Sequence, residues 1–247
     1  MPHIYLSPST QDWNTYVFGG SEEYYMNLLA DALVPYLRAN GIQFTRNTPG
    51  MIAGSSIRAS NAGNFDIHLG LHSNAAPEGR YGTVRGSEVY YAPNSYRSQR
   101  GAAMMAERLK EIYPLANRVR AIPTTSIGEV SQTRAPAIFI EVAYHDNEDD
   151  ALWIIDNIDR IAHAIALGLT DYFGTAFAVP VPPFTGIVTL AGGTLNLRSG
   201  PNVEAGVVGG IPNGARVTVY GQMDDWYGVL YGDTPGFVNT QFIRREG

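Results

Sequence analysis

The chain has 247 residues, 45% of them hydrophobic and 16% charged, a composition typical of a globular protein with a sizeable core. Its net charge of −6 argues against nucleic acid or an anionic membrane as a partner, because it has no excess of cations for phosphate groups. It has no cysteine, so a metal ion would have to be bound by His, Asp, Glu or amide groups. No apolar run approaches the ~20 residues of a membrane span.

Strand-like and helix-like segments alternate over residues 1–175. Short β-branched runs predict strands, and apolar residues repeating every three or four positions predict helices. The expected strands are 4–6, 42–46, 65–71, 88–92 and the run that begins at 136. The expected helices are 21–39, 52–61, 98–113 and 149–173. This alternation predicts an α/β domain with a mostly parallel sheet flanked by helices.

The composition changes after residue 175. Residues 176–185 are rich in proline and predict an extended, semi-rigid linker. Residues 186–247 contain short β-branched runs separated by Gly, Asn and Asp turns, and they show no helical period. We therefore expect a second, smaller domain that is all β, with the form of a small barrel.

Glu141 stands near the end of an apolar run that then breaks into the polar residues His145, Asp146 and Asn147. A buried strand that ends in ionisable groups is how α/β proteins present chemistry at the carboxyl edge of a sheet. A glutamate in apolar surroundings tends to have a raised pKa, which suits a general base. The alternative is a structural glutamate that pairs with an arginine.

Other ionisable residues are expected at the same edge. His72 follows the strand at 65–71, so parallel strands would bring it beside Glu141. His68 lies four residues earlier, ~13 Å along an extended strand, and is expected to be a packing residue rather than a ligand of the same ion. Glu22 and Glu23 open the first helix, where carboxylates complement the helix dipole, although one of them could also reach the cleft.

The segments 20–28, 65–75 and 136–147 together resemble, in order and spacing, the zinc-dependent N-acetylmuramoyl-L-alanine amidases of the type-3 class. Those enzymes cleave the amide between muramic acid and the first alanine of the peptidoglycan stem peptide. The resemblance implies that Glu23 and His72 are zinc ligands and that Glu141 is the catalytic carboxylate. We also assign Gln11 and Asn74 either to substrate binding or to support of the ligands.

One part of the family pattern is missing. The first zinc histidine normally follows the first strand, in an Asp-Pro-Gly-His-Gly loop, whereas residues 7–11 here read Ser-Pro-Ser-Thr-Gln. Three interpretations are open: His145 replaces the lost ligand, the amide oxygen of Gln11 replaces it, or the metal is lost. We favour His145, which requires the chain to fold back after Val142, and this predicts that His145→Ala loses the metal whereas Gln11→Ala keeps it.

The C-terminal residues have a resemblance of their own. The run 194–201, Thr-Leu-Asn-Leu-Arg-Ser-Gly-Pro, together with later aromatic and glycine positions, is similar to bacterial SH3-type domains. Such modules commonly bind cell-wall peptide. Four residues are candidates for wall contact, and each has a structural alternative, in a turn or in the barrel core: Asn196, Arg198, Trp226 and Tyr227.

Both resemblances predict a zinc-dependent peptidoglycan hydrolase that is targeted to the wall by its second domain, similar to an endolysin or autolysin. Residues 1–8 lack the features of a signal peptide, so we expect secretion by another route or release by lysis, with action at the bacterial wall. Two alternatives are a metal-free wall-binding protein on the same fold and a hydrolase of another peptidoglycan bond.

Overall fold

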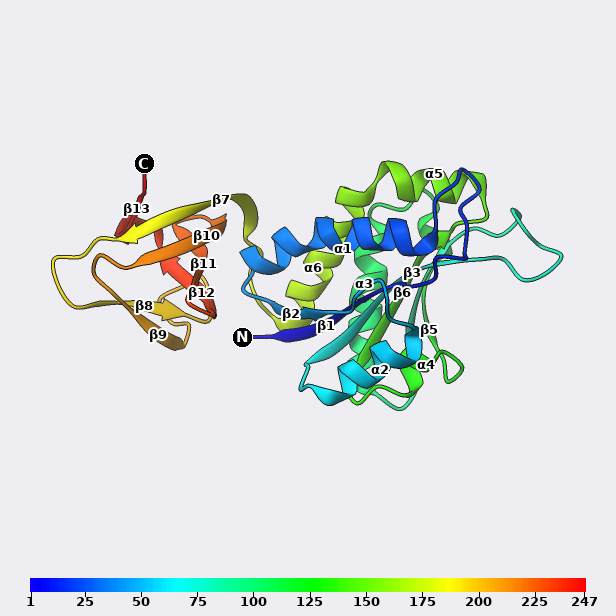
Figure 1. The fold of residues 1–247 in the computed structure, drawn as a ribbon, viewed down its shortest axis with the longest axis horizontal. Coiled ribbons are helices and arrows are strands. Elements are labelled where there is room, and N and C mark those ends of the chain that lie inside the picture. Colours follow the sequence, from blue (N-terminus) through cyan, green and yellow to red (C-terminus); the bar gives the residue numbers. More distant parts are fainter. The chain divides into compact units, whose positions relative to one another are not determined.

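The computed structural model describes all 247 residues, and the chain divides into two compact units. One unit contains His3–Leu33 and Phe44–Tyr172, and it carries the predicted α/β domain (Figure 1). The other contains Met1–Pro2, Val34–Gln43 and Phe173–Gly247. None of the helices is long and apolar enough to cross a membrane.

The first domain is built around a six-stranded sheet in the order β2-β1-β3-β6-β4-β5. Its strands are β1 (His3–Pro8), β2 (Gln43–Arg46), β3 (Ile67–Asn74), β4 (Ser87–Tyr91), β5 (Val119–Pro123) and β6 (Ala137–Tyr144). Its helices are α1 (Glu22–Ala39), α2 (Ala53–Ala62), α3 (Tyr96–Lys110), α4 (Gly128–Ser131), α5 (Glu148–Asp156) and α6 (Ile158–Phe173), with a short 3-10 turn η1 (Ala116–Arg118).

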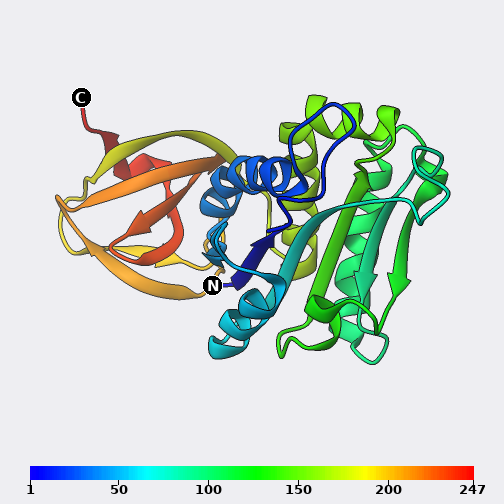
Figure 2. The same cartoon turned by 45° about the vertical axis from the view of Figure 1, so that its right-hand side comes forward.

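The central strands of this sheet run parallel. β3 pairs in parallel with both β1 and β6, whereas β4 is antiparallel to β6 and parallel to β5. Helices cover the sheet, as the turned view in Figure 2 shows. This confirms the predicted α/β class with a mostly parallel sheet flanked by helices.

Successive side chains of a strand point to opposite faces of the sheet, so one face packs against α3 and the other against α4. Ile138 of β6 packs against α3 at Gly101. The approach is so close that a Cβ atom added to Gly101 would lie 2.3 Å from the side chain of Ile138. Phe139, the next residue, packs on the other face with Val130 of α4. The face toward α4 also carries His72 and Glu141, which are register partners on β3 and β6.

The ends of α1 follow the local sequence. The hydroxyl of Ser21 accepts a hydrogen bond from the backbone N–H of Tyr24 at 3.1 Å, as an N-cap residue does. At the other end Gly41 has φ +65°, the left-handed conformation that ends many helices. Two elements had no sequence signal: β5 at the sheet edge and α4, which is only four residues long.

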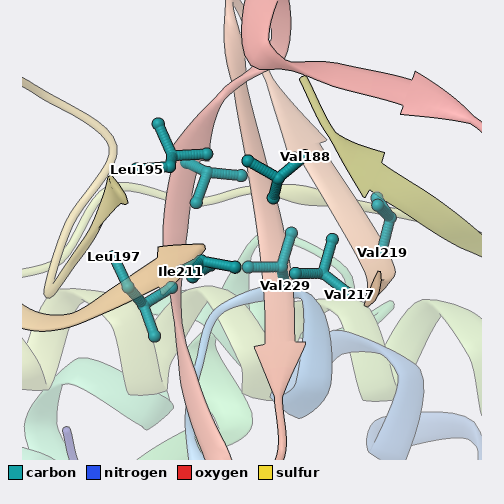
Figure 3. Close-up of a cluster of buried hydrophobic side chains, with 8 residues drawn as sticks. Val188, Leu195, Leu197, Ile211, Val217, Val219 and Val229 are labelled. Carbon is teal, nitrogen blue, oxygen red and sulfur yellow. The ribbon is translucent and has the colours of Figure 1, made fainter. Parts of the chain in front are cut away.

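The second unit contains a seven-stranded sheet in the order β13-β7-β10-β11-β12-β8-β9, which fits the predicted SH3-like domain. The strands are β7 (Val179–Val188), β8 (Thr194–Arg198), β9 (Val207–Pro212), β10 (Arg216–Met223), β11 (Trp226–Tyr231), β12 (Thr234–Asn239) and β13 (Ile243–Arg245), with a 3-10 turn η2 (Thr240–Phe242). Its core is a cluster of eight aliphatic side chains (Figure 3): Val188, Leu195, Leu197, Ile211, Val217, Val219, Val229 and Val238.

Most of the predicted linker, 176–185, lies in strand β7 and pairs with β10. The prolines are tolerated because proline lacks only the N–H donor and already favours an extended backbone. Pro182 and Pro183 fall where the register between β7 and β10 shifts, so they interrupt few ladder hydrogen bonds. The proline-rich stretch is therefore a hydrogen-bonded part of the sheet, not a free spacer.

Candidate active site

The carboxyl ends of β3 and β6 bring His72 and Glu141 side by side. The two residues are register partners in adjacent parallel strands, as expected from strands that end at one sheet edge. Glu88 of β4 stands opposite Glu141 on its other side. Period-two alternation therefore aligns three ionisable side chains across the same face of the sheet.

Glu22, in the first turn of α1, supplies a carboxylate to this edge. Its Oε1 lies 2.8 Å from Nδ1 of His72, and only 1% of the residue is exposed. Glu23, which was predicted to be the ligand, is half-buried, and its backbone N–H bonds the carbonyl of Gln11. Adjacent residues in a helix point about 100° apart, so only one of the two can face His72, and the structure brings Glu22 there.

The loop after β1 closes over Glu22. The side-chain amide of Asn14 donates to Oε2 of Glu22 at 2.7 Å and to Oε1 of Gln11 at 3.2 Å. The amide nitrogen of Gln11 lies 3.5 Å from Nδ1 of His72. Gln11 is thus placed where the loop reaches the His72–Glu22 pair.

Glu141 has an unusual environment for a carboxylate. Its Oε2 is buried and has no hydrogen-bond partner. Burial raises the pKa of Glu141 to about 8; the charge of His72 opposes this shift, and the charges of Glu22 and Glu88 add to it. A carboxyl group that gains and loses a proton near neutral pH is suited to proton transfer.

His72 is held between two carboxylates. Burial disfavours its charged form, but the carboxylates of Glu129 and Glu22 outweigh burial and raise its pKa to about 10. Burial also raises the pKa of Glu22, but contacts to His72 and Asn14 lower it more, so the net shift is downward. The ring of His72 stacks on Phe139 at a centroid distance of 4.2 Å, which limits its rotation.

Glu129 was missed by sequence reasoning. It lies on α4, is 5% exposed, and its Oε2 is 2.7 Å from both Nε2 of His68 and Oγ of Ser7. Its pKa is lowered, because hydrogen bonds and charges from His68 and His72 outweigh its burial. A glutamate beside Val130 in a short loop has little to distinguish it in the sequence. His68, predicted to be a packing residue, is fully buried within this network.

That His145 joins His72 and Glu23 as a metal ligand stays a prediction, and the His145 ring has other partners in this structure. β6 continues in extended conformation to Tyr144, so the chain does not fold back after Val142. Nδ1 of His145 lies 2.9 Å from the backbone oxygen of Ser73, and its ring stacks on Tyr16 at 5.4 Å. His145 therefore supports the site from the side of the Ser73 backbone.

The residues after His145 hold the long loop between β3 and β4. The carboxylate of Asp146 accepts from the backbone N–H groups of Ala76 and Gly82 at 3.1 and 2.9 Å. Asn147 caps α5 and donates to the carbonyl of Gly82 at 2.6 Å. The loop between β3 and β4 is thus fastened at its base by this polar pair.

Asn74, at the end of β3, faces Glu88. Its side-chain amide donates to Oε2 of Glu88 at 3.3 Å, and Tyr90 donates to the same oxygen at 2.6 Å. The other oxygen of Glu88 pairs with Arg120 at 2.6 Å. Asn74 therefore supports the carboxylate next to Glu141.

The residues around His72 fit a divalent cation in charge and chemistry. Three carboxylates surround one imidazole, and Nε2 of His72 and Oε2 of Glu141 are both buried without a hydrogen-bond partner. A cation would neutralise this surplus of negative charge. No three His, Cys, Asp or Glu side chains converge on one point, so a third protein ligand would have to be of another type, such as the amide of Gln11.

The second domain contains a groove of about 280 Å³. Asn196, Arg198 and Trp226, three of the candidate wall-contact residues, line it. Arg198 also donates to the carbonyl of Ala205 at 2.9 Å, which shapes the turn after β8. Tyr227 instead packs against the aliphatic core and meets Phe184 edge to face at 5.7 Å.

The comparisons with known proteins agree with both domains. Residues 9–171 match the family described as N-acetylmuramoyl-L-alanine amidase, and residues 193–244 match the bacterial SH3 domain. No curated protein sequence matches the chain.

Solved structures share the fold at low sequence identity. N-acetylmuramoyl-L-alanine amidase AmiC2 of Nostoc punctiforme is 15% identical with a TM-score of 0.61, covering 70% of this chain and 97% of that one. Cwp6 from Clostridium difficile is 23% identical with a TM-score of 0.60, covering 69% of this chain and 29% of that one. The catalytic domain of the CD27L endolysin is 19% identical with a TM-score of 0.57, covering 69% and 98%. Since the family match spans most of the chain, this protein belongs to the N-acetylmuramoyl-L-alanine amidases and carries a bacterial SH3 domain after its amidase domain.

Proposed function

We propose that this amidase is a zinc-dependent peptidoglycan hydrolase that cleaves the amide between N-acetylmuramic acid and L-alanine of the stem peptide. The observation that carries the proposal is Glu141, a carboxyl with an unpartnered buried oxygen and a pKa of about 8, beside the His72–Glu22 pair. A carboxyl with this pKa is half ionised at about pH 8 and still exchanges its proton at neutral pH, so it can both accept and return a proton.

The residues of the chain divide the reaction between them. Glu141 takes a proton from the attacking water, whose oxygen then bonds to the carbonyl carbon. As the C–N bond breaks, Glu141 returns that proton to the leaving alanine nitrogen. Burial raises the pKa of Tyr16, the nearby Ser73 side chain opposes this shift, and the charges of Glu22 and Glu141 add to it, so Tyr16 stays a neutral hydroxyl. Its hydroxyl is unpartnered and available to donate a hydrogen bond.

Glu22 and His72 would hold the zinc ion, and Gln11 would be the third protein donor through its side-chain oxygen, which requires its amide to turn over because the nitrogen is the atom that now faces His72. A bound ion of this kind supplies a Lewis acid that polarises the amide carbonyl and makes water more acidic. Glu22 Oε1 and His72 Nδ1 already face each other at 2.8 Å, and Asn14 holds both Glu22 and Gln11. This ligand set replaces the predicted set of Glu23, His72 and His145.

Metal binding by single variants tests the ligand set. Zinc per chain is measured after dialysis for the wild type, Gln11→Ala and His145→Ala. We expect Gln11→Ala to lower zinc affinity by about tenfold or more and His145→Ala to retain zinc, which reverses the prediction from sequence. Loss of zinc in His145→Ala with full retention in Gln11→Ala would restore the earlier ligand set.

The SH3 domain would hold the enzyme on its substrate through the groove lined by Asn196, Arg198 and Trp226. A second binding site on the same chain raises the effective concentration of the catalytic domain at the wall, so weak contacts in each domain suffice. Action at the bacterial wall, as in endolysins or autolysins, follows from this arrangement.

The shortage of charged ligands also favours a second candidate, a metal-free protein that only binds the wall. Incubation with purified walls separates the two functions. New alanine amino termini without new reducing sugar ends support the amidase, and reducing ends would indicate cleavage of the glycan instead. Wall binding with no release of either kind, by protein that holds no zinc, would establish the binding protein.

A further inference from the structure

Glu129 connects two histidines that the strand geometry keeps apart. His68 and His72 point to the same face of β3 but stand four residues, or ~13 Å, from each other. Oε2 of Glu129 lies 2.7 Å from Nε2 of His68, and Oε1 lies 3.4 Å from Nε2 of His72. The single carboxylate, brought in by α4, therefore spans the gap between the two rings.

The position of Glu129 is fixed from behind by buried neighbours. Ser7 donates to Oε2 of Glu129 at 2.7 Å and is itself 2.8 Å from the hydroxyl of Ser56. His68 is fully buried, its Nδ1 is 3.0 Å from the hydroxyl of Ser60, and its ring stacks on Tyr5 at 5.3 Å. Both short contacts go to Oε2, so Oε1 is the oxygen turned toward His72.

The two nitrogens of His72 face different carboxylates. Nδ1 is 2.8 Å from Glu22, on the side of the proposed zinc ligands. Nε2 is buried, has no hydrogen-bond partner at the distance observed, and points toward Glu129. A neutral imidazole carries a proton on one nitrogen and a free lone pair on the other. A hydrogen-bond acceptor beside Nε2 keeps the proton there, so the lone pair is on Nδ1.

We propose that Glu129 is a positioning residue that accepts the Nε2–H of His72 and thereby fixes Nδ1 as the metal-binding nitrogen. Ser7 and His68 act through Glu129 by holding its Oε2. Carboxylates that orient a metal-bound histidine in this way raise metal affinity, and their loss typically costs 10–100-fold. The inference rests on the zinc site of the proposed function and adds a residue that none of the ligand assignments contained.

The test measures Zn²⁺ affinity of the full chain by competition with a chromophoric chelator, for the wild type and Glu129→Gln. We expect Glu129→Gln to bind Zn²⁺ about 10–100-fold more weakly. With Co²⁺ in place of Zn²⁺, the visible absorption band should change in Glu129→Gln, because the ligand ring is no longer held in one orientation. Neither readout depends on catalytic activity.

Val130→Ala is the matched control. Val130 is the next residue of α4, is 3% exposed and packs with Ala137 and Phe139, so the variant weakens the packing of α4 without touching the carboxylate. Its Zn²⁺ affinity and Co²⁺ spectrum should equal those of the wild type. If Glu129→Gln does not fold, Ser7→Ala removes one contact to Oε2 and should weaken Zn²⁺ binding by about threefold to tenfold.

The outcomes separate the two proposals. If the wild type binds Zn²⁺ and Glu129→Gln binds it equally well, the role of Glu129 is wrong and the zinc site stands. Equal losses in Glu129→Gln and Val130→Ala would also overturn it, because the effect would then belong to α4 as a whole. If the wild type binds no Zn²⁺, the zinc site and the role of Glu129 fall together.

Discussion

The two domains have interiors of opposite character. The core of the SH3 domain consists of eight aliphatic side chains, none more than 7% exposed (Figure 3). The amidase domain has on one sheet face a buried group of titratable residues, including Glu22, His68, His72 and Glu129, each at most 6% exposed. Both are closed to water, but they are held together by different forces.

An aliphatic core is non-directional, and its stability follows the apolar area removed from water. A polar interior depends on pairing, because a buried ionisable group that loses its partner is costly. Unpartnered buried atoms therefore indicate where the functional site lies. The SH3 core can only stabilise its domain, whereas the buried, unpartnered Oε2 of Glu141 in the amidase interior marks the place where a ligand or substrate would complete the structure.

The largest expected effect comes from the unpaired carboxylate. Glu141→Gln keeps the size of the side chain and removes its ability to exchange a proton, so release of alanine amino termini from purified walls should fall by ~10²–10⁴. Zinc content and the circular dichroism spectrum should stay unchanged, since Glu141 is not among the proposed ligands. Retention of more than a tenth of the activity would contradict the assignment of Glu141 as the base.

The aliphatic core should give the opposite result. Leu197 is 1% exposed, and Leu197→Ala should cost the SH3 domain ~2–5 kcal/mol in free energy of unfolding through the cavity it leaves. Hydrogen exchange of residues 186–247 measures this loss. Leu197→Ala should cleave a small soluble muropeptide as fast as the wild type, because this substrate does not need wall anchoring. A loss of this activity that parallels the loss of stability would show that the domains do not function separately.

The sequence predicted the framework of the amidase site but not its detailed contacts. Parallel strands must end at one edge, so the proximity of His72 to Glu141 follows from the pattern alone. The choice between Glu22 and Glu23 could not be made, because it depends on the rotation of α1 about its axis, which tertiary packing decides. The contacts of His145 could not be predicted either, because nothing in the sequence says that β6 stays extended through Tyr144.

Glu129 illustrates a different limit. It reaches His68 and His72 from a four-residue helix that precedes β6, and so short an element has no periodicity to detect. The polar face of β3 was visible as alternating residues, but the group that pairs with them comes from a distant part of the chain, 61 residues beyond His68. Only the tertiary fold shows that His68 is a paired residue of the site.

The buried carboxyl of Glu141 should make the stability of the amidase domain depend on pH, which an aliphatic core cannot do. Glu141 has a pKa of about 8 in the folded, metal-free protein against an ordinary value of 4.5, so the folded state holds its proton more tightly than the unfolded state. The cost of ionising it is absent below pH 4.5, grows as the pH rises toward 8, and is largest above 8. Metal-free Glu141→Gln should therefore be ~2–4 kcal/mol more stable than the wild type at pH 8.5 and no more stable at pH 4.5.

Urea unfolding followed by the helical circular dichroism signal measures this difference, since the helices belong mainly to the amidase domain. Glu78→Gln, which changes an exposed carboxylate in the loop after β3, is the control and should show no dependence of this kind. Equal stability of Glu141→Gln and the wild type at both pH values would mean that Glu141 is already solvated or paired in the folded protein.

The smallest effect is expected at the surface groove of the SH3 domain, where neighbouring aromatic residues differ in role. Trp226 lines the groove, whereas Tyr227 packs against the aliphatic core. Trp226→Ala should weaken binding to purified walls by about tenfold, or ~1.4 kcal/mol, with little change in stability, because an aromatic side chain at a contact site contributes mainly to binding. Tyr227→Ala should lower the stability of the domain instead, and the folded fraction should keep its affinity for walls.

Cosedimentation with walls measures the affinity of the two variants, and thermal unfolding measures their stability. A loss of affinity in Tyr227→Ala with none in Trp226→Ala would show that the wall-binding surface is not the groove.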